Sequence, residues 1–453
     1  MSKKSLNPVC MPACNPSADG RSIAGRLIAR GVNLPQPETV FIGGDVVPER
    51  IASGVTIHPG CRLTGNKTSV GPGCELGAEA PVTLADCQLG ERVKLQGGAF
   101  SEATFLNGAA MASGAHVRPG TLVEEEAGGA HTVGLKQTIL FPYVVLGSLI
   151  NFCDCLMAGG TSASNHSEVG SSYIHFNYTP HQDKATASLI GDVPRGVMLD
   201  QPPIFLGGQG GLVGPIRVAF GTVVPSGIIL LKDVLQGGLC VARTASAATA
   251  ASAAKSASAT VIAPYCPGAY RAIQRIVANN LIYIGNINAL RVWYRDVRAT
   301  FLRADPFQDA CLAGAYARLA SVMQERVRRL EELAGKMPVS LELAKADCQD
   351  LAAAPYRQQR SLIERWPMMR AALAGLDHVE GSVRDRDNLL SALGRLPPGT
   401  SYLDAVRTLS SNARAAGTAW LQSLVDVTAA LWPSGKPDDG LPAEALGRRQ
   451  DGR

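Results

Sequence analysis

The chain has few aromatic residues, with Phe, Trp and Tyr together making up 5% of 453 residues, whereas 46% are hydrophobic. A core built mainly from rings is therefore excluded, and the hydrophobic content also excludes global disorder. The chain is instead rich in glycine, with 48 residues. Small and branched aliphatic residues must then form the core, which favours a tightly wound chain.

Several further features are missing. No basic block with interleaved aromatics accompanies the net charge of +5, so nucleic acid is not an expected partner. No run reaches the roughly 20 apolar residues of a membrane span. The opening "MSKKSLNPVCMPACNPSADG" has two lysines but no apolar segment after them, and thus does not resemble a secretory signal. We expect a cytoplasmic protein.

The cysteines number eleven, an odd count, which favours reduced thiols. The spacings Cys10 to Cys14 and Cys153 to Cys155 could suit a metal, but neither has a matching second pair at zinc-site spacing. The sequence therefore predicts no metal.

The most informative pattern is a period of six. Aliphatic residues recur at this spacing in runs that include Ile51, Ile57, Leu63; Val70, Leu76, Val82; Leu89, Leu95; Met111, Val117, Val123; and Leu206, Leu212, Val218, Val224, Leu230. Neither an amphipathic helix nor a hairpin predicts this spacing. Three hexads form one triangular coil of a β-helix. The pattern thus predicts a β-solenoid over residues 39–235, after an N-terminal extension at 1–38.

The period changes in the last third of the chain. Residues 244–260 form an Ala/Ser/Thr tract that is typical of a linker. In "ARLASVMQERVRRLEELAGKM" the apolar residues recur at three and four, and Gly335 is expected to end that helix. We predict an all-α domain at 261–435 and a tail at 436–453.

Spacing also suggests a site. Arg118 and Lys136 are eighteen residues apart, which is one coil, so they should stack about 4.8 Å apart along the solenoid axis. Two cations this close repel unless an anion such as phosphate lies between them. The alternative is a pair of solvated surface cations.

Longer segments resemble a known family. "RPGTLVEEEAGGAHTVGLKQT", "VGSSYIHFNY", "SLIGD" and "FLGGQGGLVGPIRVAFGTVVPSG" are similar to the acetyltransferase domain of the bifunctional glucosamine-1-phosphate acetyltransferase and N-acetylglucosamine-1-phosphate uridyltransferase. The resemblance covers about 110–235. It implies a left-handed hexapeptide-repeat β-helix that forms a homotrimer and uses acetyl-CoA. The chain also resembles stand-alone β-helix proteins labelled UDP-N-acetylglucosamine pyrophosphorylases, although no residue supports that chemistry.

The resemblance assigns roles to individual residues. It implies that Arg118 and Lys136 bind the sugar phosphate, with Glu168 in place of an asparagine that binds the sugar. The residues that it places at the coenzyme are Ser171, Asn177, Tyr178, Gly208 and Ser226. Acceptor and coenzyme would lie between neighbouring prisms of the trimer.

Departures from the family concern catalysis. Phe152 stands where the family has its general-base histidine, and Cys155 stands where it has a tyrosine. Phenylalanine cannot accept a proton. The remaining candidates are His131, His166, His175 and His181, of which His175 is chosen because it alternates with Asn177.

Other sequence features narrow the choice of function. The phosphate loop of the nucleotidyltransferase half is absent, because "LGGQGGLVG" lies within regular coils. A trimeric carbonic anhydrase of the γ type would need three histidine ligands, for which His166, His175 and His181 are the candidates.

Two hypotheses follow. The first is an acetyl-CoA-dependent acyltransferase that acts on an amino sugar phosphate or a nucleotide sugar. The second is a non-catalytic nucleotide-sugar-binding or scaffolding trimer whose helical domain recruits a partner. In "HFNYTPHQDK", the first half is expected to contact the coenzyme, and the loop from Thr179 onward is expected to cover a neighbouring chain.

Overall fold

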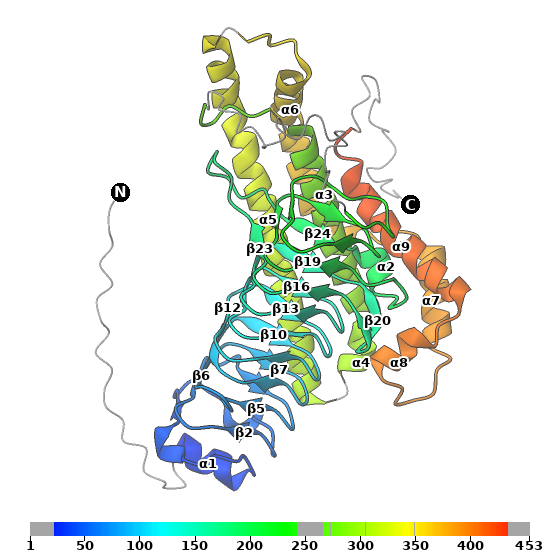
Figure 1. Cartoon of the computed structure of the whole chain (residues 1–453). Coiled ribbons are helices and arrows are strands. Elements are labelled where there is room, and N and C mark those ends of the chain that lie inside the picture. Colours follow the sequence, from blue (N-terminus) through cyan, green and yellow to red (C-terminus); the bar gives the residue numbers. More distant parts are fainter. Residues whose placement is uncertain (1–21, 242–265, 272, 304, 348, 434–453) are drawn as a thin grey trace, which may run out of the picture.

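A computed structural model describes residues 22–241, 266–271, 273–303, 305–347 and 349–433. These residues form a parallel β-solenoid with a helical region along one side (Figure 1). The predicted fold class is confirmed. The predicted linker at 244–260 and the tail at 436–453 lie outside the described residues, as do residues 1–21 of the predicted extension.

The solenoid has three flat faces, which we name A, B and C. Face A has nine strands in the order β2 (Thr56–Ile57), β5 (Glu75–Leu76), β8 (Lys94–Leu95), β11 (Ala110–Met111), β14 (Gly128–Gly129), β17 (Val145–Leu146), β22 (Glu168–Val169), β25 (Phe205–Leu206) and β28 (Val223–Val224). Face B has ten, in the order β1 (Phe41–Ile42), β3 (Arg62–Thr64), β6 (Val82–Ala85), β9 (Gly98–Ser101), β12 (Ala115–Val117), β15 (Gly134–Lys136), β18 (Asn151–Cys153), β23 (Ile174–Phe176), β26 (Gly211–Val213) and β29 (Ile229–Leu230). Face C has eight, in the order β4 (Ser69–Val70), β7 (Gln88–Leu89), β10 (Ala103–Phe105), β13 (Thr121–Val123), β16 (Ile139–Leu140), β19 (Cys155–Met157), β24 (Ser188–Ile190) and β27 (Arg217–Val218). A separate pair, β20 (Gly160–Ser162) and β21 (Asn165–His166), is antiparallel.

The six-residue period forms the inside of the prism. Ile57, Leu76 and Leu95 are all fully buried on face A and stack in register from β2 through β5 to β8. On face B, Val117 lies beside Leu135 in the next coil. Each coil therefore buries aliphatic side chains against the coils above and below it, and hydrophobic burial holds the stack together.

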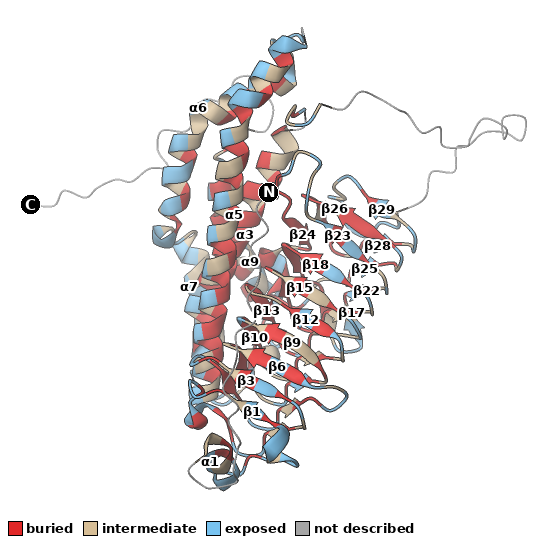
Figure 2. Cartoon of the chain, turned by 90° about the vertical axis from the view of Figure 1, so that its left-hand side faces the viewer, coloured by how far each residue is buried: buried red, intermediate tan, exposed pale blue. Residues whose placement is uncertain are grey.

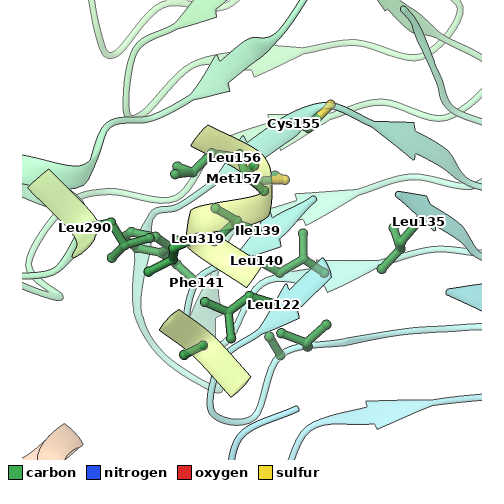
Figure 3. Packing of buried hydrophobic residues seen from close by; sticks show 14 of the residues in the cluster. Leu122, Leu135, Ile139, Leu140, Phe141, Cys155, Leu156, Met157, Leu290 and Leu319 are labelled. Atoms are coloured by element: carbon green, nitrogen blue, oxygen red, sulfur yellow. The ribbon is translucent and has the colours of Figure 1, made fainter. Parts of the chain in front are cut away.

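Face C differs from the other two because its middle coils, β13 to β24, are apolar on both sides. Its outward residues Leu122, Ile139, Leu156 and Leu189 follow one another in register, and at most 3% of each is exposed. Figure 3 shows three of them packed near Leu290 and Leu319 of the helical region. An apolar outer face must be covered, and this explains why the helices lie on face C.

The helical region contains α3 (Ile273–Trp293), the π-helical turn η4 (Tyr294–Arg298), α4 (Ala299–Leu302), α5 (Pro306–Ala346), α6 (Ala354–Ala374), η5 (Leu376–His378), α7 (Val383–Leu393), α8 (Tyr402–Arg407) and α9 (Ser411–Ala429). Shorter helices of the solenoid part are α1 (Ile23–Ala29), η1 (Pro37–Thr39), η2 (Pro48–Arg50) and α2 (Val193–Gly196). Helix α5 contacts β4, β7, β10 and β13, while α3 contacts β24. Both helices run along the solenoid, and much of each is buried (Figure 2).

Helix α5 begins at a side-chain cap and ends later than its sequence suggested. The Asp305 carboxylate accepts the backbone N–H groups of Phe307 and Gln308 at 2.8 and 3.0 Å, which makes it an N-cap. The prediction that Gly335 ends the helix is wrong, because α5 continues to Ala346. Buried contacts beyond Gly335, among them the Ser340 hydroxyl that accepts Tyr270 N–H at 2.9 Å, outweigh the roughly 1 kcal/mol cost of glycine in a helix.

Among the described helices, none combines the length and the apolar character that crossing a membrane requires.

Candidate functional site

A small pocket at the corner between faces B and C collects three of the predicted site residues. Its cavity volume is about 200 Å³. The residues that line it, named the basic pocket below, are Arg118, Lys136, Asn151, Cys153, Asp154, Asn177, Lys184, Glu325 and Arg329. The resemblance implied a sugar-phosphate contact for Arg118 and Lys136 and a coenzyme contact for Asn177, and all three line this pocket.

The solenoid register positions the first side chains. Val117 pairs with Leu135 and Lys136 pairs with Cys153, so Arg118, Lys136 and Cys153 follow one another along the corner in successive coils. The spacing of eighteen residues predicted the first of these steps. Asn177 comes directly after β23, and α5 supplies Glu325 and Arg329 from the other side.

A buried ion pair forms the floor of the basic pocket. Arg326 Nη2 lies 2.6 Å from Asp154 Oδ1, and 1% and 5% of the two side chains are exposed. Asn177 Nδ2 donates to the other carboxylate oxygen of Asp154 at 2.9 Å. Both oxygens of Asp154 are therefore occupied, and this carboxylate fixes Asn177 while it anchors α5 to the solenoid. Arg326 and Asp154 are 172 residues apart, and no sequence pattern indicated that they would meet.

Arg118 and Lys136 remain without a carboxylate partner in the described part of the chain. Arg118 donates from Nη2 to Cys153 Sγ at 3.1 Å, and its Nε has no acceptor. Burial raises the pKa of the Cys153 thiol, although the neighbouring Arg118 lowers it. A thiol with a raised pKa stays protonated near neutral pH and does not neutralise the guanidinium.

The charges of the basic pocket do not cancel. Arg118, Lys136, Lys184 and Arg329 contribute four positive charges, and Asp154 and Glu325 contribute two negative ones, which leaves +2. Arg329 is already paired with Glu325 at 2.8 Å and with Glu332 at 2.9 Å. The uncompensated cations are thus on the solenoid side, and the arrangement suits an anion with several oxygens.

His175 points into the prism, where 2% of it is exposed. Its Nδ1 lies 2.5 Å from the carbonyl oxygen of Cys153, and its Nε2 lies 2.8 Å from Ser188 Oγ. A carbonyl can only accept, so Nδ1 donates, and in the neutral ring Nε2 accepts from the Ser188 hydroxyl. Burial lowers the pKa of His175. Both nitrogens are engaged in the core, so a catalytic role for His175 stays a prediction that this geometry does not favour. His175 points inward from β23, whereas Asn177 follows the end of that strand.

Phe152 is a core residue as well. It is fully buried in β18 and packs edge-to-face against Tyr173, with ring centroids 6.2 Å apart. A side chain at position 152 therefore points into the prism and away from the basic pocket.

The predicted coenzyme positions Ser171, Gly208 and Ser226 form a column at the corner between faces A and B. The backbone N–H of Gln209 donates to Ser171 O at 2.8 Å, and that of Gly227 donates to Gly208 O at 2.9 Å. A Cβ on Gly208 would lie 2.5 Å from the Ser171 carbonyl oxygen, so only glycine fits there. The coils of this corner are therefore packed closely through small residues.

His131 belongs to the same column. The N–H of Leu149 donates to His131 O, and the N–H of Ser172 donates to Ser148 O, so positions 131, 148 and 171 are equivalent in successive coils. The side chain of His131 is 60% exposed. Of the four candidate bases, His131 is therefore at the predicted coenzyme corner and open to solvent.

Glu168 and Tyr178 lie apart from the lining of the basic pocket. Glu168 is exposed in β22 on face A. Tyr178 is 57% exposed, and Lys184 Nζ lies 5.9 Å from the centroid of its ring. Within one chain, Glu168 and Tyr178 therefore do not line the pocket that contains Arg118 and Lys136.

The loop after Thr179 is held by the helical region of its own chain, and its expected cover of a neighbouring chain stays a prediction. Lys336 Nζ donates to the carbonyl oxygens of His181 and Gln182 at 3.1 and 2.7 Å, and Tyr270 Oη donates to Asp183 Oδ2 at 3.0 Å. These partners belong to the helical region of the same chain. The loop is held there because its carbonyl groups and its carboxylate meet donors that the sequence pattern did not reveal.

A metal site is not formed by the described residues, in which no group of three or more potential ligands comes together. His175 is in the core, whereas the Nδ1 of His166 lies 2.8 Å from the Ala163 carbonyl oxygen, where it donates. His181 accepts Gly268 N–H at its Nδ1. The three-histidine arrangement of a γ-type carbonic anhydrase is therefore absent from these residues.

Comparison with known proteins agrees with this solenoid geometry. The bifunctional protein GlmU of Pelobacter propionicus is 29% identical over 225 residues, which are 49% of this chain and 44% of that protein. The bifunctional protein GlmU of Thermus thermophilus is 30% identical over 224 residues, again 49% and 44%. The solenoid is similar to part of GlmU. This confirms the predicted resemblance to a hexapeptide-repeat, acetyltransferase-like domain.

The match to GlmU covers only part of each protein. The chain spans less than half the length of these GlmU relatives. No family model matches the chain. The match therefore concerns about half of this chain.

Proposed function

We propose that this chain is an acyltransferase that transfers an acetyl group from acetyl-CoA to the amine of an amino sugar phosphate or nucleotide sugar. The observation that carries the proposal is the convergence of Arg118, Lys136 and Asn177 in one pocket of net positive charge. Support also comes from the GlmU relatives.

The phosphate is held by the solenoid cations. Arg118 has an unused Nε donor, and Lys136 adds a second positive charge in the next coil. Asn177, fixed by Asp154 at 2.9 Å, orients the ligand beside them. A pocket of about 200 Å³ accommodates a phosphate group and part of a sugar but not a whole nucleotide sugar, so the remainder would extend into solvent or toward another chain.

The acetyl donor fits the column of small residues at the A/B corner. Acetyl-CoA supplies an activated thioester there. The acceptor amine attacks the carbonyl carbon, the C–N bond forms as the C–S bond breaks, and the thiol leaves. His131 is the base that we assign to the amine proton, because it is exposed and shares the corner with Ser171.

The two corners require more than one chain. His131 and Lys136 are five residues apart on an extended segment, which corresponds to roughly 16 Å. An amine next to a phosphate held at the B/C corner cannot reach a thioester at the A/B corner of the same chain. We therefore propose a homotrimer in which the A/B corner of one prism faces the B/C corner of its neighbour.

The test is a binding and turnover experiment with the full chain. Titration with acetyl-CoA, glucosamine 1-phosphate and UDP-N-acetylglucosamine, followed by a thiol-release assay, should show binding of donor and acceptor and release of one thiol per acetylated amine. Loss of turnover in His131→Ala with binding intact would support its assignment. Absence of binding by both donor and acceptor would overturn the proposal.

A second candidate function is non-catalytic binding of a sugar phosphate. It is favoured by two observations: Phe152 and His175 both lie in the core. In that case the sugar phosphate binds, and Arg118→Ala weakens this binding. No thiol is released with any combination of substrates.

A further inference from the structure

A second basic site is suggested by one arginine of α5. Arg318 is 5% exposed, and its Nε and Nη1 have no hydrogen-bond acceptor. Two other buried arginines of the helical region have partners: Arg298 binds Glu125 at 2.7 Å and Arg326 binds Asp154 at 2.6 Å. No such ion pair is formed by Arg318 with the carboxylates of the described residues.

A buried guanidinium without a partner is costly. Burial lowers the pKa of Arg318 below its usual value, but an arginine remains protonated at any physiological pH. Unlike a buried lysine or histidine, it cannot relieve the cost by losing its proton. The charge therefore requires a counter-ion or ordered polar ligands from outside the chain.

Arg318 lines a cavity of about 460 Å³ between the N-terminal half of α5 and the first coils. We name it the α5 cavity. It is lined by Glu49, Arg50, Lys67, Ser69, Gln88, Pro306, Phe307, Asp309, Ala310, Ala313, Gly314, Ala317 and Arg318. Three of these residues are cations and two are carboxylates, so the lining has a net charge of +1.

The nearby carboxylates do not supply the missing partner. Glu49 lies 3.3 Å from Arg26, which pairs with it. Asp86 accepts the backbone N–H of Lys67 at 3.0 Å, and together with Glu102 it acts on Arg318 only through space. Asp309 is exposed on the first turns of α5.

The position of Arg318 is fixed by a close approach of α5 to face C. A Cβ on Gly314 would lie 2.3 Å from Gln88 Oε1 and 2.5 Å from Thr104 Oγ1. Gln88 is itself satisfied, because Nε2 donates to Lys67 O at 2.9 Å and Oε1 accepts from Thr104 at 3.0 Å. Arg318 lies one turn beyond Gly314 and lines the cavity. Gln88 does not supply a hydrogen-bond acceptor for it.

We propose that the α5 cavity binds an oxyanion of the phosphate class, with Arg318 as the central ligand and Lys67 and Arg50 at the rim. The site is separate from the basic pocket, because Arg318 and Arg329 are eleven residues apart on α5, which corresponds to roughly 16 Å. It takes a free phosphate or the phosphate group of a small metabolite, because the cavity is larger than one phosphate.

The experiment uses inorganic phosphate as the probe and the full chain in an Arg118→Ala, Lys136→Ala background, which removes the main cations of the basic pocket. Thermal unfolding and calorimetry are followed at constant ionic strength, with chloride replaced by phosphate. We expect phosphate to raise the melting temperature of this parent. Adding Arg318→Met should weaken phosphate binding at least tenfold. It should not lower the melting temperature measured in chloride, because it removes an uncompensated buried charge.

The matched control is Arg328→Ala on the same helix, whose side chain is 47% exposed and whose loss should leave the phosphate response unchanged. A phosphate response that Arg318→Met does not reduce, or a parent that does not respond to phosphate, would overturn the proposal. If Arg318→Met does not fold, Lys67→Ala replaces it, because Lys67 is exposed. That variant should bind phosphate at least threefold more weakly, and unchanged affinity would contradict the site.

Discussion

Arg118 and Lys136 lie side by side because their coils stack in register, and no carboxylate of the described residues pairs with either of them. Like charges this close repel, which costs stability unless an anion is bound. The repulsion between Arg118 and Lys136 therefore lowers the stability of the solenoid. Packing alone would favour an uncharged side chain at these positions, which supports the proposal that they bind a phosphate.

Arg118→Ala should weaken binding of a sugar phosphate by about 10- to 100-fold, which corresponds to the roughly 1.5–3 kcal/mol of a hydrogen bond to a charged group. Calorimetric titration with glucosamine 1-phosphate measures this. The control is Lys94→Ala, which removes an exposed cation from face A and should leave affinity unchanged. Equal affinities of wild type and Arg118→Ala would show that the pocket does not hold the phosphate.

His175 should make stability depend on pH. Its folded-state pKa lies below the usual 6.5 because of burial, so below that pH the unfolded chain takes up a proton that the folded chain resists. Stability contributed by the neutral ring is then lost as the pH falls from 7 toward 5. Urea unfolding at pH 7, 6 and 5 should show a steeper loss for wild type than for His175→Gln. Parallel curves would mean that His175 titrates normally and is not locked in the core.

The buried pair of Asp154 and Arg326 acts at the scale of elements, because it joins face C and the B/C corner to α5. Removal of one partner leaves a buried charge, and the cost of this is about 3–5 kcal/mol. Arg326→Met should therefore lower the free energy of unfolding by this amount and also release Asn177, since Asp154 holds both.

Two comparisons make the measurement specific. Arg328→Ala breaks exposed pairs with Glu325 and Glu332 and should cost less than about 1 kcal/mol. In a double-mutant cycle, Asp154→Asn with Arg326→Met should cost less than the sum of the single changes. Additive costs would show that the two side chains do not interact.

The sequence predicted the elements of the solenoid well, because each coil repeats one local rule. Ile57, Leu76 and Leu95 are fully buried as their spacing requires. The position of the helices could not be derived in this way, although a signal existed. "TLV", "TIL", "CLM" and "SLI" place two apolar residues in succession on face C, where a strand exposed on one side would alternate.

The candidate site was predictable only in part. Arg118 and Lys136 are related by the repeat, so their contact follows from spacing. Arg326 meets Asp154 through the docking of α5, which no local pattern encodes. The burial of His175 was not predictable from alternation, which shows which residues share a face of a strand but not which face points inward.

The helical region covers face C of the solenoid, which leaves faces A and B uncovered in the described part of the chain. The last coils expose Ile174, Phe176 and Ile229, with 40%, 39% and 51% of these residues accessible. Apolar residues gathered on one part of a surface favour association, which agrees with the proposed homotrimer.

Sedimentation analysis of the full chain should show a trimer, and Ile229→Glu should shift the population toward smaller species because it places a charge in an apolar contact. Val383→Glu is the control, since Val383 is 44% exposed on α7, away from the solenoid. A monomer in both wild type and variant would contradict the trimer and, with it, an active site shared between prisms.

The long helix on face C also limits how this molecule can evolve. Solenoids commonly gain or lose whole repeats, because each coil touches only its neighbours. Here, α5 bridges β4, β7, β10 and β13 and is tied farther along to Asp154. One inserted coil would lengthen the prism by about 4.8 Å, which is roughly three helical residues at 1.5 Å each and less than one turn. Such an insertion would rotate and displace Arg326 relative to Asp154, so the number of coils and the length of α5 can change only together.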